Sequence, residues 1–347
     1  MIEVTIGIPV YNVEGYVAKC LLSALDQDFR LSYEILVIDD CGTDRSIDEV
    51  QKVINSHKRG NLVKIIKHQE NKGLGPARNT AMENAQGKYI FFLDSDDWIS
   101  SDCIRLLYDK AIITDADVVV GSVSRVEELS RKEVGNNKYD DRTIKTIAAG
   151  VFMTGQYQDM HIEVWNKLYR ISFLKENNIK FVHRIFEDYY FDFRMRASSN
   201  VIALIPQTTL FYNIRDNSIL TSLKKNNGSD LSAKIFCEII GLMQKMIVAE
   251  YSMINGIYDL YFQRITWIAE NLNRYHYTNE QWKYIQDHIG KFVSFVPDKT
   301  FLGIKRNQIM YRLCRKFDCM GQFIFAIKLL SIKEKIFHKL IICKLDK

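Results

Sequence analysis

The 347-residue sequence has little that would crosslink it or anchor it in a membrane. Its seven cysteines are an odd, scattered set without a CxxC pair, which indicates neither a disulfide framework nor a thiolate zinc site: Cys20, Cys41, Cys103, Cys237, Cys314, Cys319 and Cys343. No window approaches the roughly 20 uncharged apolar residues of a membrane span, and the start, MIEVTIGIPVYN, does not resemble an export signal. Reduced thiols in a cytoplasmic protein are the simplest interpretation.

Several catalytic signatures are missing as well. No GxGxxG follows a predicted strand, which excludes the dinucleotide-type phosphate loop. The first predicted strand ends in PVYN and supplies no carboxylate, which argues against an aspartyl-phosphate phosphatase. A nucleotidyltransferase would show a glycine-rich loop and a basic residue at the same place, and PVYNVEG has neither. We find no internal repeat.

What is present is a regular alternation of short strands and helices in the first 120 residues. The hydrophobic fraction of 47% is sufficient for a sizeable core. Runs of mainly β-branched and aromatic residues predict strands, and segments of helical period lie between them, including one at 75–87 that Gly87 would end: strands at 3–10, 33–38, 62–67, 88–93 and 116–120. This order predicts an α/β fold with a doubly wound, mostly parallel sheet.

The pattern is less regular beyond residue 125. Residues 163–181 predict a helix leading into a strand, and residues 186–197 a further helix. The polar segment KKNNGSD at 224–230 is the best linker candidate, and the sequence after it is helical in period. We therefore predict one domain over 1–223 and a mainly helical C-terminal region over 224–347.

Three aspartates directly follow the strand predicted at 88–93. Asp94, Asp96 and Asp97 would lie at the carboxyl edge of the sheet, where open α/β sheets bind ligands. Carboxylates this close repel one another unless a cation or hydrogen-bond donors offset the repulsion, and their oxygens suit Mg²⁺ or Mn²⁺. The alternative is that they cap the next helix, although Ser100 or Ser101 is better placed to do so.

The strand predicted at 33–38 also ends in acids, Asp39 and Asp40. A carboxylate at this edge can accept a hydrogen bond from the imide N–H of uracil or from ribose hydroxyls. The alternative is a turn in which the side chain of the first aspartate accepts from the backbone. Both interpretations stay open.

Four motifs in order, IPVYN, EILVIDDCGTDRS, NKGLGPARN and GKYIFFLDSDDW, resemble those of glycosyltransferase family 2. The resemblance is close over about the first 100 residues and looser to about 220. It implies the GT-A fold, a nucleotide-diphosphate sugar donor, a divalent metal (Mn²⁺ or Mg²⁺) and inversion at the anomeric carbon.

The resemblance also implies roles for individual residues. Asp40 resembles the carboxylate that reads the base, Asp96 and Asp97 the metal ligands, and Arg78 a residue near the nucleotide. Arg78 has the alternative of a salt bridge that braces the aspartate pair, Asp39 and Asp40. The positions that the resemblance places around the nucleotide sugar are Pro9, Tyr11, Asn12, Glu14, Asp39, Asp40, Lys72, Gly73, Arg78, Asp94, Ser95, Asp96, Arg215 and Ser218.

The catalytic base is expected in RIFEDYYFDF, where Glu187 and Asp188 start a predicted helix among aromatic residues. Apolar surroundings raise a carboxylate pKa toward neutrality. Asp188 matches the usual catalytic aspartate of the family, and Glu187 is the second candidate. The alternative is a pair of acids at a helix N-terminus, favoured by the helix dipole. Trp165 and Asn166 of WNKLY resemble an acceptor-pocket segment, and Trp165 as plain core is the alternative.

The basic excess of the chain lies in its tail. Residues 301–347 hold 11 Lys and Arg against 3 Asp and Glu, whereas the whole chain holds 47 against 42. Apolar residues and lysines alternate at helical spacing over 323–345, which suits a helix on an anionic membrane surface or an ordinary packed helix. Flotation of the full chain on liposomes, compared with a chain ending near residue 300, would separate the two; equal flotation contradicts membrane contact.

These observations favour an inverting, metal-dependent hexosyl- or N-acetylhexosaminyltransferase that uses a nucleotide sugar, with UDP as the family's usual nucleotide. It would act on a glycan or lipid-linked acceptor in surface polysaccharide synthesis, such as capsule or O-antigen, in the cytoplasm or at the inner face of its membrane. The alternative is a catalytically silent GT-A module that binds glycan or assembles a synthase complex. The sequence names neither the sugar nor the acceptor.

Overall fold

The computed structural model describes residues 1–128, 130, 132–145, 160–182, 187–215 and 230–248. The chain divides into two compact units, residues 1–149 with 156–218, and residues 150–155 with 219–347. The second unit is described only over residues 230–248, which include helix α8 (Asp230–Met246). The boundary predicted at 223/224 and the basic tail at 323–345 lie outside the described residues.

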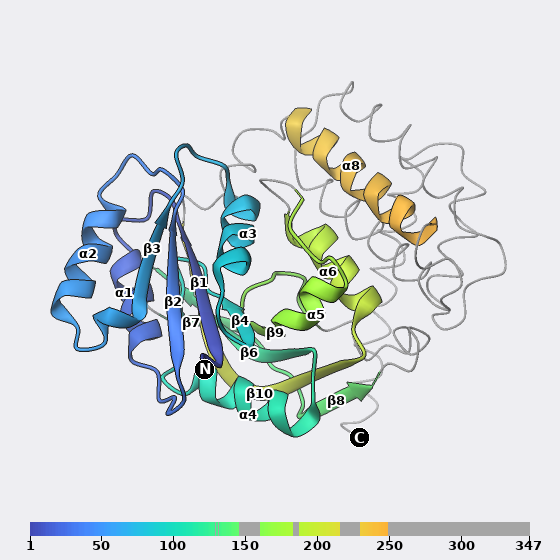
Figure 1. Ribbon diagram of the computed structural model, residues 1–347, viewed down its shortest axis with the longest axis horizontal. Helices are drawn as coiled ribbons and strands as arrows, with labels where there is room; N and C mark the ends of the chain where they lie inside the picture. Colours follow the sequence, from blue (N-terminus) through green and yellow to red (C-terminus); the bar gives the residue numbers. More distant parts are fainter. Residues whose placement is uncertain (129, 131, 146–159, 183–186, 216–229, 249–347) are drawn as a thin grey trace, which may run out of the picture. The chain divides into compact units, whose positions relative to one another are not determined.

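The first unit begins with four parallel strands in the order β3-β2-β1-β4. Helices α1 and α2 cover one face of these strands and α3 the other, as right-handed crossovers require (Figure 1). Chain order therefore reverses between β1 and β4, the point where open α/β sheets bind ligands. The elements are β1 (Val4–Val10), α1 (Val17–Leu25), β2 (Tyr33–Asp39), α2 (Ser46–Ser56), η1 (Gly60–Leu62), β3 (Val63–Lys67), α3 (Leu74–Asn84) and β4 (Tyr89–Phe92).

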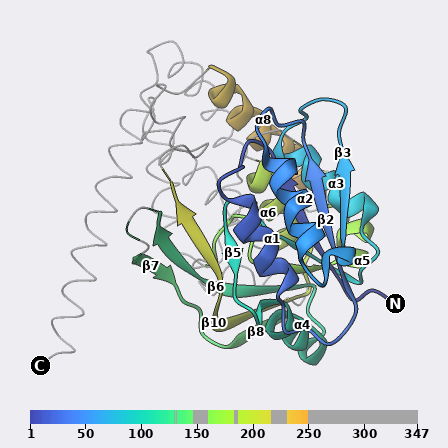
Figure 2. The same cartoon turned by 90° about the vertical axis from the view of Figure 1, so that its left-hand side faces the viewer.

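The rest of the sheet is mixed. Strand β9 pairs antiparallel with both β4 and β6, β10 runs parallel to β6, and the short strands β5, β7 and β8 are antiparallel to their partners. Figure 2 shows β6, β7 and β10 extending beside one another. The elements are β5 (Trp98–Ile99), α4 (Cys103–Thr114), β6 (Val118–Glu127), β7 (Glu133–Asn137), β8 (Arg142–Lys145), β9 (Lys167–Arg170), α5 (Ile171–Glu176), α6 (Glu187–Ser198) and β10 (Val201–Ile214).

The predicted α/β fold class is confirmed, with parallel pairing concentrated in the N-terminal half of the sheet. Three local predictions are corrected. Residues 163–181 hold a strand followed by a helix, β9 then α5, which is the reverse of the predicted order. Helix α3 ends at Asn84, before Gly87. Helix α4 has Asp102 at its N-cap position, without a side-chain cap bond, so neither the serines nor Asp94–Asp97 cap it.

The core lies between the sheet and its helices. The inward faces of β1, β2 and β4 are fully buried, and α1 packs Val17, Leu21 and Leu25 against them. Burial of such side chains stabilises the fold by roughly 1.5–3 kcal/mol each. Within the described residues, no helix is both long and apolar enough to cross a membrane. The polar residues at the carboxyl ends of β2 and β4 therefore stand out against an apolar interior.

Candidate active site

The acids predicted to be functional lie at element ends in the first unit. Asp40 directly follows β2, Asp94 follows β4 after one residue, and Glu187 and Asp188 open α6. Because β2 and β4 flank β1 and all three are parallel, their carboxyl ends lie along one edge of the sheet. The N-terminus of α6 joins this edge through contacts with Arg78 of α3.

Asp40 is buried and accepts hydrogen bonds from three donors. Its Oδ1 accepts from His68 Nδ1 at 2.6 Å and from the Lys72 N–H at 2.8 Å, and its Oδ2 accepts from the Gly73 N–H at 2.8 Å. Gly73 has φ 94°, in the left-handed region that favours glycine. His68 Nε2 lies 2.8 Å from Thr80 Oγ1 on α3. Asp40 thus holds the loop that connects β3 to α3.

Three other residues that were predicted to bind the nucleotide, Asp39, Asn12 and Glu14, accept hydrogen bonds from backbone N–H groups in the loops near Asp40. Asp39 Oδ1 accepts from the Cys41 N–H at 3.1 Å, which is the turn bond of the alternative interpretation. Asn12, with φ 51°, accepts from the Thr43 N–H at 2.7 Å, and Glu14 accepts from the Arg45 N–H at 3.0 Å. These bonds tie the β1–α1 loop to the β2–α2 loop.

Two further predicted residues on β1 and its loop differ in access. Pro9 is buried inside β1, in register with Ile38 of β2. Tyr11 is 47% exposed beside this loop. An exposed aromatic ring at a strand end is suited to stacking on a nucleoside base.

Arg78 is the centre of the second acidic cluster. Its Nη1 donates to Glu187 Oε1 at 2.6 Å and to Asp188 Oδ1 at 2.9 Å, and its Nη2 donates to Asp94 Oδ1 at 2.7 Å. The guanidinium and the Glu187 carboxylate are buried, whereas Asp94 and Asp188 are partly accessible. Arg78 therefore pairs with acids other than Asp39 and Asp40, the pair named in the alternative interpretation, and it joins the end of β4 to the start of α6.

Three carboxylates share one guanidinium, so negative charge is in excess. Burial and the charge of Glu187 raise the pKa of Asp188 well above its usual range, against the opposing effect of Arg78. Burial also raises the pKa of Glu187, and Arg78 again opposes it. Although burial disfavours its charge, the three acids raise the pKa of Arg78. A carboxyl group with a raised pKa in this position is suited to accept a proton.

Asp96 and Asp97 differ in what they face. Asp96 Oδ2 accepts from Arg215 Nε at 2.7 Å, and its side chain is 22% exposed. Asp97 is buried, and its Oδ1 accepts from the backbone N–H of Asn213 on β10 at 2.8 Å. Burial, with the charges of Asp96 and Asp94, raises the pKa of Asp97 well above its usual range. Ser95, between Asp94 and Asp96, is buried, and Ser218 lies outside the described residues.

The acids at this edge fit a divalent ion as a partial set of ligands. Asp97 Oδ2 is buried and has no hydrogen-bond partner in the described chain, and Asp96 beside it adds a second carboxylate. Such uncompensated charge favours a nearby cation. The described residues contain no group of three or more His, Cys, Asp or Glu that could hold a metal ion. One or two carboxylates suffice for Mg²⁺ where substrate phosphates complete the coordination.

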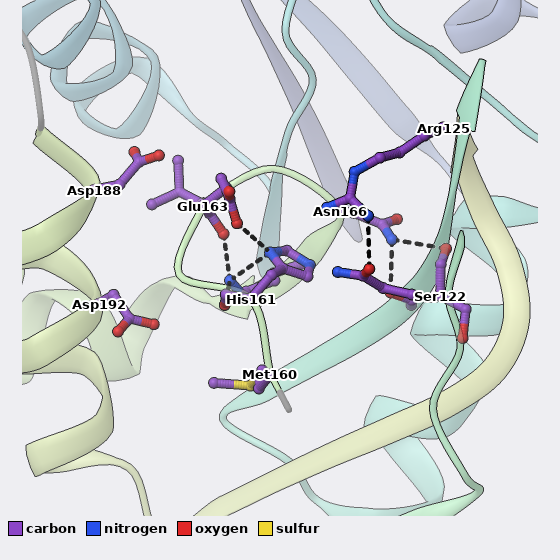
Figure 3. Close-up of polar contacts among 12 residues, drawn as sticks. Ser122, Arg125, Met160, His161, Glu163, Asn166, Asp188 and Asp192 are labelled. Carbon is purple, nitrogen blue, oxygen red and sulfur yellow. Dashed lines mark hydrogen bonds and ion pairs between the residues drawn. The ribbon is translucent and has the colours of Figure 1, made fainter. Parts of the chain in front are cut away.

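The residues predicted for the acceptor lie in the core. Trp165 is 5% exposed and its ring stacks between His161 and Tyr212. Asn166 is fully buried; its Nδ2 donates to the carbonyls of Gly121 and Ser122, and its Oδ1 accepts from Thr209 (Figure 3). This corrects the expectation that either side chain faces an acceptor in this structure, and for Trp165 it matches the core alternative.

Sequence reasoning missed several residues that complete the site. His68 follows β3 directly, so the rule that located Asp39 and Asp40 could have found it. Asn213 supports Asp97 from a strand 116 residues away, and no local pattern indicates that bond. Glu163 was also missed, although its charge contributes to the raised pKa of Asp188, after burial and nearer charges.

Comparisons with known proteins identify a family and several relatives. Residues 5–185 match the family model described as "Glycosyl transferase family 2". The chain is 30% identical over 223 residues to glycosyltransferase GlyA of Streptococcus pneumoniae serotype 4, covering 62% of this chain and 31% of that protein. It is 27% identical over 219 residues to the poly(ribitol-phosphate) beta-N-acetylglucosaminyltransferase TarS of Staphylococcus aureus, covering 61% of this chain and 35% of TarS.

The fold is also similar to a solved structure. The crystal structure of S. aureus TarS residues 1–349 in complex with UDP-GlcNAc has a TM-score of 0.65 to this chain at 20% identity, covering 91% of this chain and 88% of that one. At this identity the likeness concerns the fold alone. The matched sequence segments span about a third of the two curated relatives, so the activities in their names belong to longer proteins.

Proposed function

The chain belongs to glycosyl transferase family 2, and we propose that it transfers a hexose or N-acetylhexosamine from a UDP-sugar, with inversion, to a hydroxyl group of a glycan or lipid-linked acceptor. The observation that carries the proposal is the Arg78 cluster. It holds a carboxyl group of raised pKa, Asp188, at the same sheet edge as the acids that follow β4.

Asp188 is the proposed general base. Its carboxylate would take the proton of the acceptor hydroxyl while that oxygen attacks the anomeric carbon, and the bond from that carbon to the diphosphate breaks. Arg78 and the start of α6 fix the position of the carboxylate, because Arg78 donates to both Glu187 and Asp188. Glu187 keeps a second negative charge beside the base and so favours protonation of Asp188.

The nucleotide would bind along the carboxyl ends of β1 and β2. Tyr11 offers an exposed ring for the base, and the loop held by Asp40 carries Lys72, whose ammonium group would pair with the phosphates. Mn²⁺ or Mg²⁺ on Asp96, with Asp97 next to it, would neutralise charge on the departing diphosphate. Arg215 pairs with Asp96 and so supplies a positively charged side chain next to the proposed metal position.

The names of two relatives suggest a biological setting. TarS is named for transfer to poly(ribitol phosphate), and GlyA is named as a glycosyltransferase. We infer a role in surface polysaccharide synthesis with a cytoplasmic nucleotide sugar. The free thiols among the described residues, on Cys20, Cys41, Cys103 and Cys237, suit a reducing compartment.

A donor panel tests the proposal. The full chain is incubated with UDP-, GDP-, dTDP- and CMP-sugars with and without Mn²⁺, and both thermal shift and nucleotide release are recorded. We expect a Mn²⁺-dependent response to UDP-sugars that Asp96→Asn abolishes. Asp188→Asn should still bind donor but lose transfer by about 10²–10⁴-fold.

An exposed aspartate provides the matched control, since Asp48→Asn should behave as the unmodified chain. Retained transfer in Asp188→Asn would move the base to Glu187. No response to any donor would leave the silent-module alternative as the better account.

A further inference from the structure

Residues 160–167 form a loop that is fixed at both ends by buried bonds. Lys167 Nζ, fully buried on β9, donates to the carbonyl oxygens of His161 at 2.8 Å and of Glu163. Asn166, with φ 58°, donates to two carbonyls of β6. The His161 N–H donates to Tyr139 Oη, and the His161 ring stacks on Trp165 with centroids 4.6 Å apart. The loop therefore has little freedom to rearrange.

Glu163 is the one side chain of residues 160–167 that reaches the surface. The other seven residues are buried, whereas the Glu163 side chain is 40% exposed. In Figure 3 it lies on the side of His161 that faces Asp188 of α6. A rigid loop that presents a single carboxylate next to a proposed catalytic base is a specific arrangement, because surface carboxylates usually lie on mobile side chains.

The environments of Glu163 and Asp188 push their pKa values apart. Although burial acts in the other direction, the contacts with His161 lower the pKa of Glu163 to about 2, and its Oε2 lies 3.4 Å from His161 Nδ1. Asp188, in contrast, has a raised pKa, to which burial, Glu187, Asp94 and Glu163 contribute while Arg78 opposes them. Since one of these two carboxyl groups has a lowered pKa and the other a raised pKa, they are suited to different tasks.

We propose that Glu163 is an acceptor-binding residue whose carboxylate accepts hydrogen bonds from hydroxyl groups of an uncharged sugar acceptor next to Asp188. This rests on the proposed function. The buried His161 and Lys167 are its positioning residues, since they hold the Glu163 carboxylate and backbone in place.

The charge around Asp188 defines the class of acceptor. Glu163, Glu187, Asp188 and Asp94 are acidic, and Arg78, which pairs with three of them, is fully buried. An anionic acceptor group such as a phosphate would be repelled by this group of carboxylates. A neutral hydroxyl group can instead donate to a carboxylate, and it needs no counter-ion. The site therefore favours neutral glycans over phosphate polymers.

Transfer kinetics of the full chain test this inference. With p-nitrophenyl glycosides of glucose, galactose and N-acetylglucosamine as acceptors, Glu163→Gln should raise the acceptor KM by about tenfold or more and leave the donor KM within about twofold. Glu163→Asp, which keeps the charge, should restore part of the loss. Glu176→Gln on α5, an exposed glutamate, is the matched control and should change neither constant.

The pH profile gives a second readout that a purely structural role would not move. Loss of the Glu163 charge should lower the pKa of Asp188, so the acid limb of the rate should shift to lower pH in Glu163→Gln and stay in place in Glu163→Asp. Because water can replace the sugar, UDP release without acceptor also reports this limb. A limb that stays in place in Glu163→Gln overturns the inference.

Two further outcomes separate this inference from the proposed function. An acceptor KM that is unchanged in Glu163→Gln, or faster transfer by the unmodified chain to poly(ribitol phosphate) than to the neutral glycosides, overturns the inference and leaves the proposed function standing. If the unmodified chain releases no nucleotide from any donor, the proposed function fails first, and this inference fails with it.

Discussion

Asp40 and Asp188 belong to the same unit, but the hydrogen-bond partners of their carboxylates differ. Asp40 accepts from His68 and from two backbone N–H groups, all in its own half of the sheet. Asp188 shares one guanidinium with Glu187 and Asp94. Donors outnumber acids in the first cluster, and acids outnumber cations in the second. We infer that the first cluster fixes the conformation of a loop, whereas the excess negative charge of the second raises the pKa of the proposed base.

The largest effect is expected from removing the shared cation. Arg78→Ala leaves three carboxylates without a partner, and breaking a buried ion pair in this way costs about 3–5 kcal/mol of unfolding free energy. Urea unfolding at neutral pH measures it. The loss should shrink toward low pH, because protonated carboxyl groups no longer repel one another. Arg78→Lys should lose less than alanine, and an alanine variant within about 1 kcal/mol of the unmodified chain would contradict the charge-excess account.

A smaller loss is expected in the cluster that is already satisfied. Asp40→Asn replaces one acceptor oxygen by an N–H₂ group, which cannot serve all three donors and leaves at least one buried N–H unpaired. We expect a cost of about 1–3 kcal/mol and a raised KM for the donor. Asp48→Asn is the exposed control. If Asp40→Asn proved more destabilising than Arg78→Ala, the inference that the Arg78 cluster depends more strongly on its charged partner would be wrong.

The next prediction concerns the pH dependence of transfer and tests the second cluster alone. Transfer needs Asp188 without its proton, so with a raised pKa the rate should increase as pH rises through that value. Burial and then Glu187 are the main causes of the shift. Glu187→Gln should therefore move the acid limb of kcat/KM to lower pH, and each unit of movement is roughly a tenfold gain in rate below the limb. A limb that stays in place or moves upward would contradict this account of the raised pKa, and loss of transfer in Glu187→Gln would indicate that Glu187, not Asp188, takes the proton.

The same contrast explains what the sequence could predict. Strands β1 to β4 can be predicted from the local sequence, because each is an apolar run bounded by turn residues. The acids that follow β2 and β4 lie at one edge of the sheet because both strands are parallel to β1. The Asp40 cluster was accordingly within reach, including His68, which follows β3 directly. Local periodicity could not give the partners of Arg78, because Glu187 and Asp188 lie 109 and 110 residues further along the chain.

The order of β9 and α5 was predicted wrongly for a related reason. Lys167–Arg170 is only four residues long, and its strand conformation is fixed by antiparallel pairing with β4 and β6 rather than by its own pattern. The burial of Trp165 and Asn166 next to β9 follows from the same pairing. The family motif WNKLY located this segment in the sequence. It could not predict which way the side chains of Trp165 and Asn166 point, because pairing with distant strands decides that.

The smallest effect should come from the outer link of the first cluster, His68 to Thr80. His68 Nδ1 must donate to Asp40, since a carboxylate only accepts, and Nε2 contacts Thr80 Oγ1 at 2.8 Å. His68→Asn keeps a donor near Asp40 but is too short to reach Thr80, and Thr80→Val removes the hydroxyl with little change of shape. Each should cost about 0.5–1.5 kcal/mol in urea unfolding.

A double-mutant cycle decides whether this link acts as one unit. If the His68–Thr80 bond is what each variant loses, the cost of the double variant should be clearly below the sum of the single ones, because the second substitution has no bond left to remove. Additive costs would mean that His68 acts on Asp40 alone. The loop would then depend on the Lys72 and Gly73 N–H groups, and the first cluster would be held by its backbone donors rather than by α3.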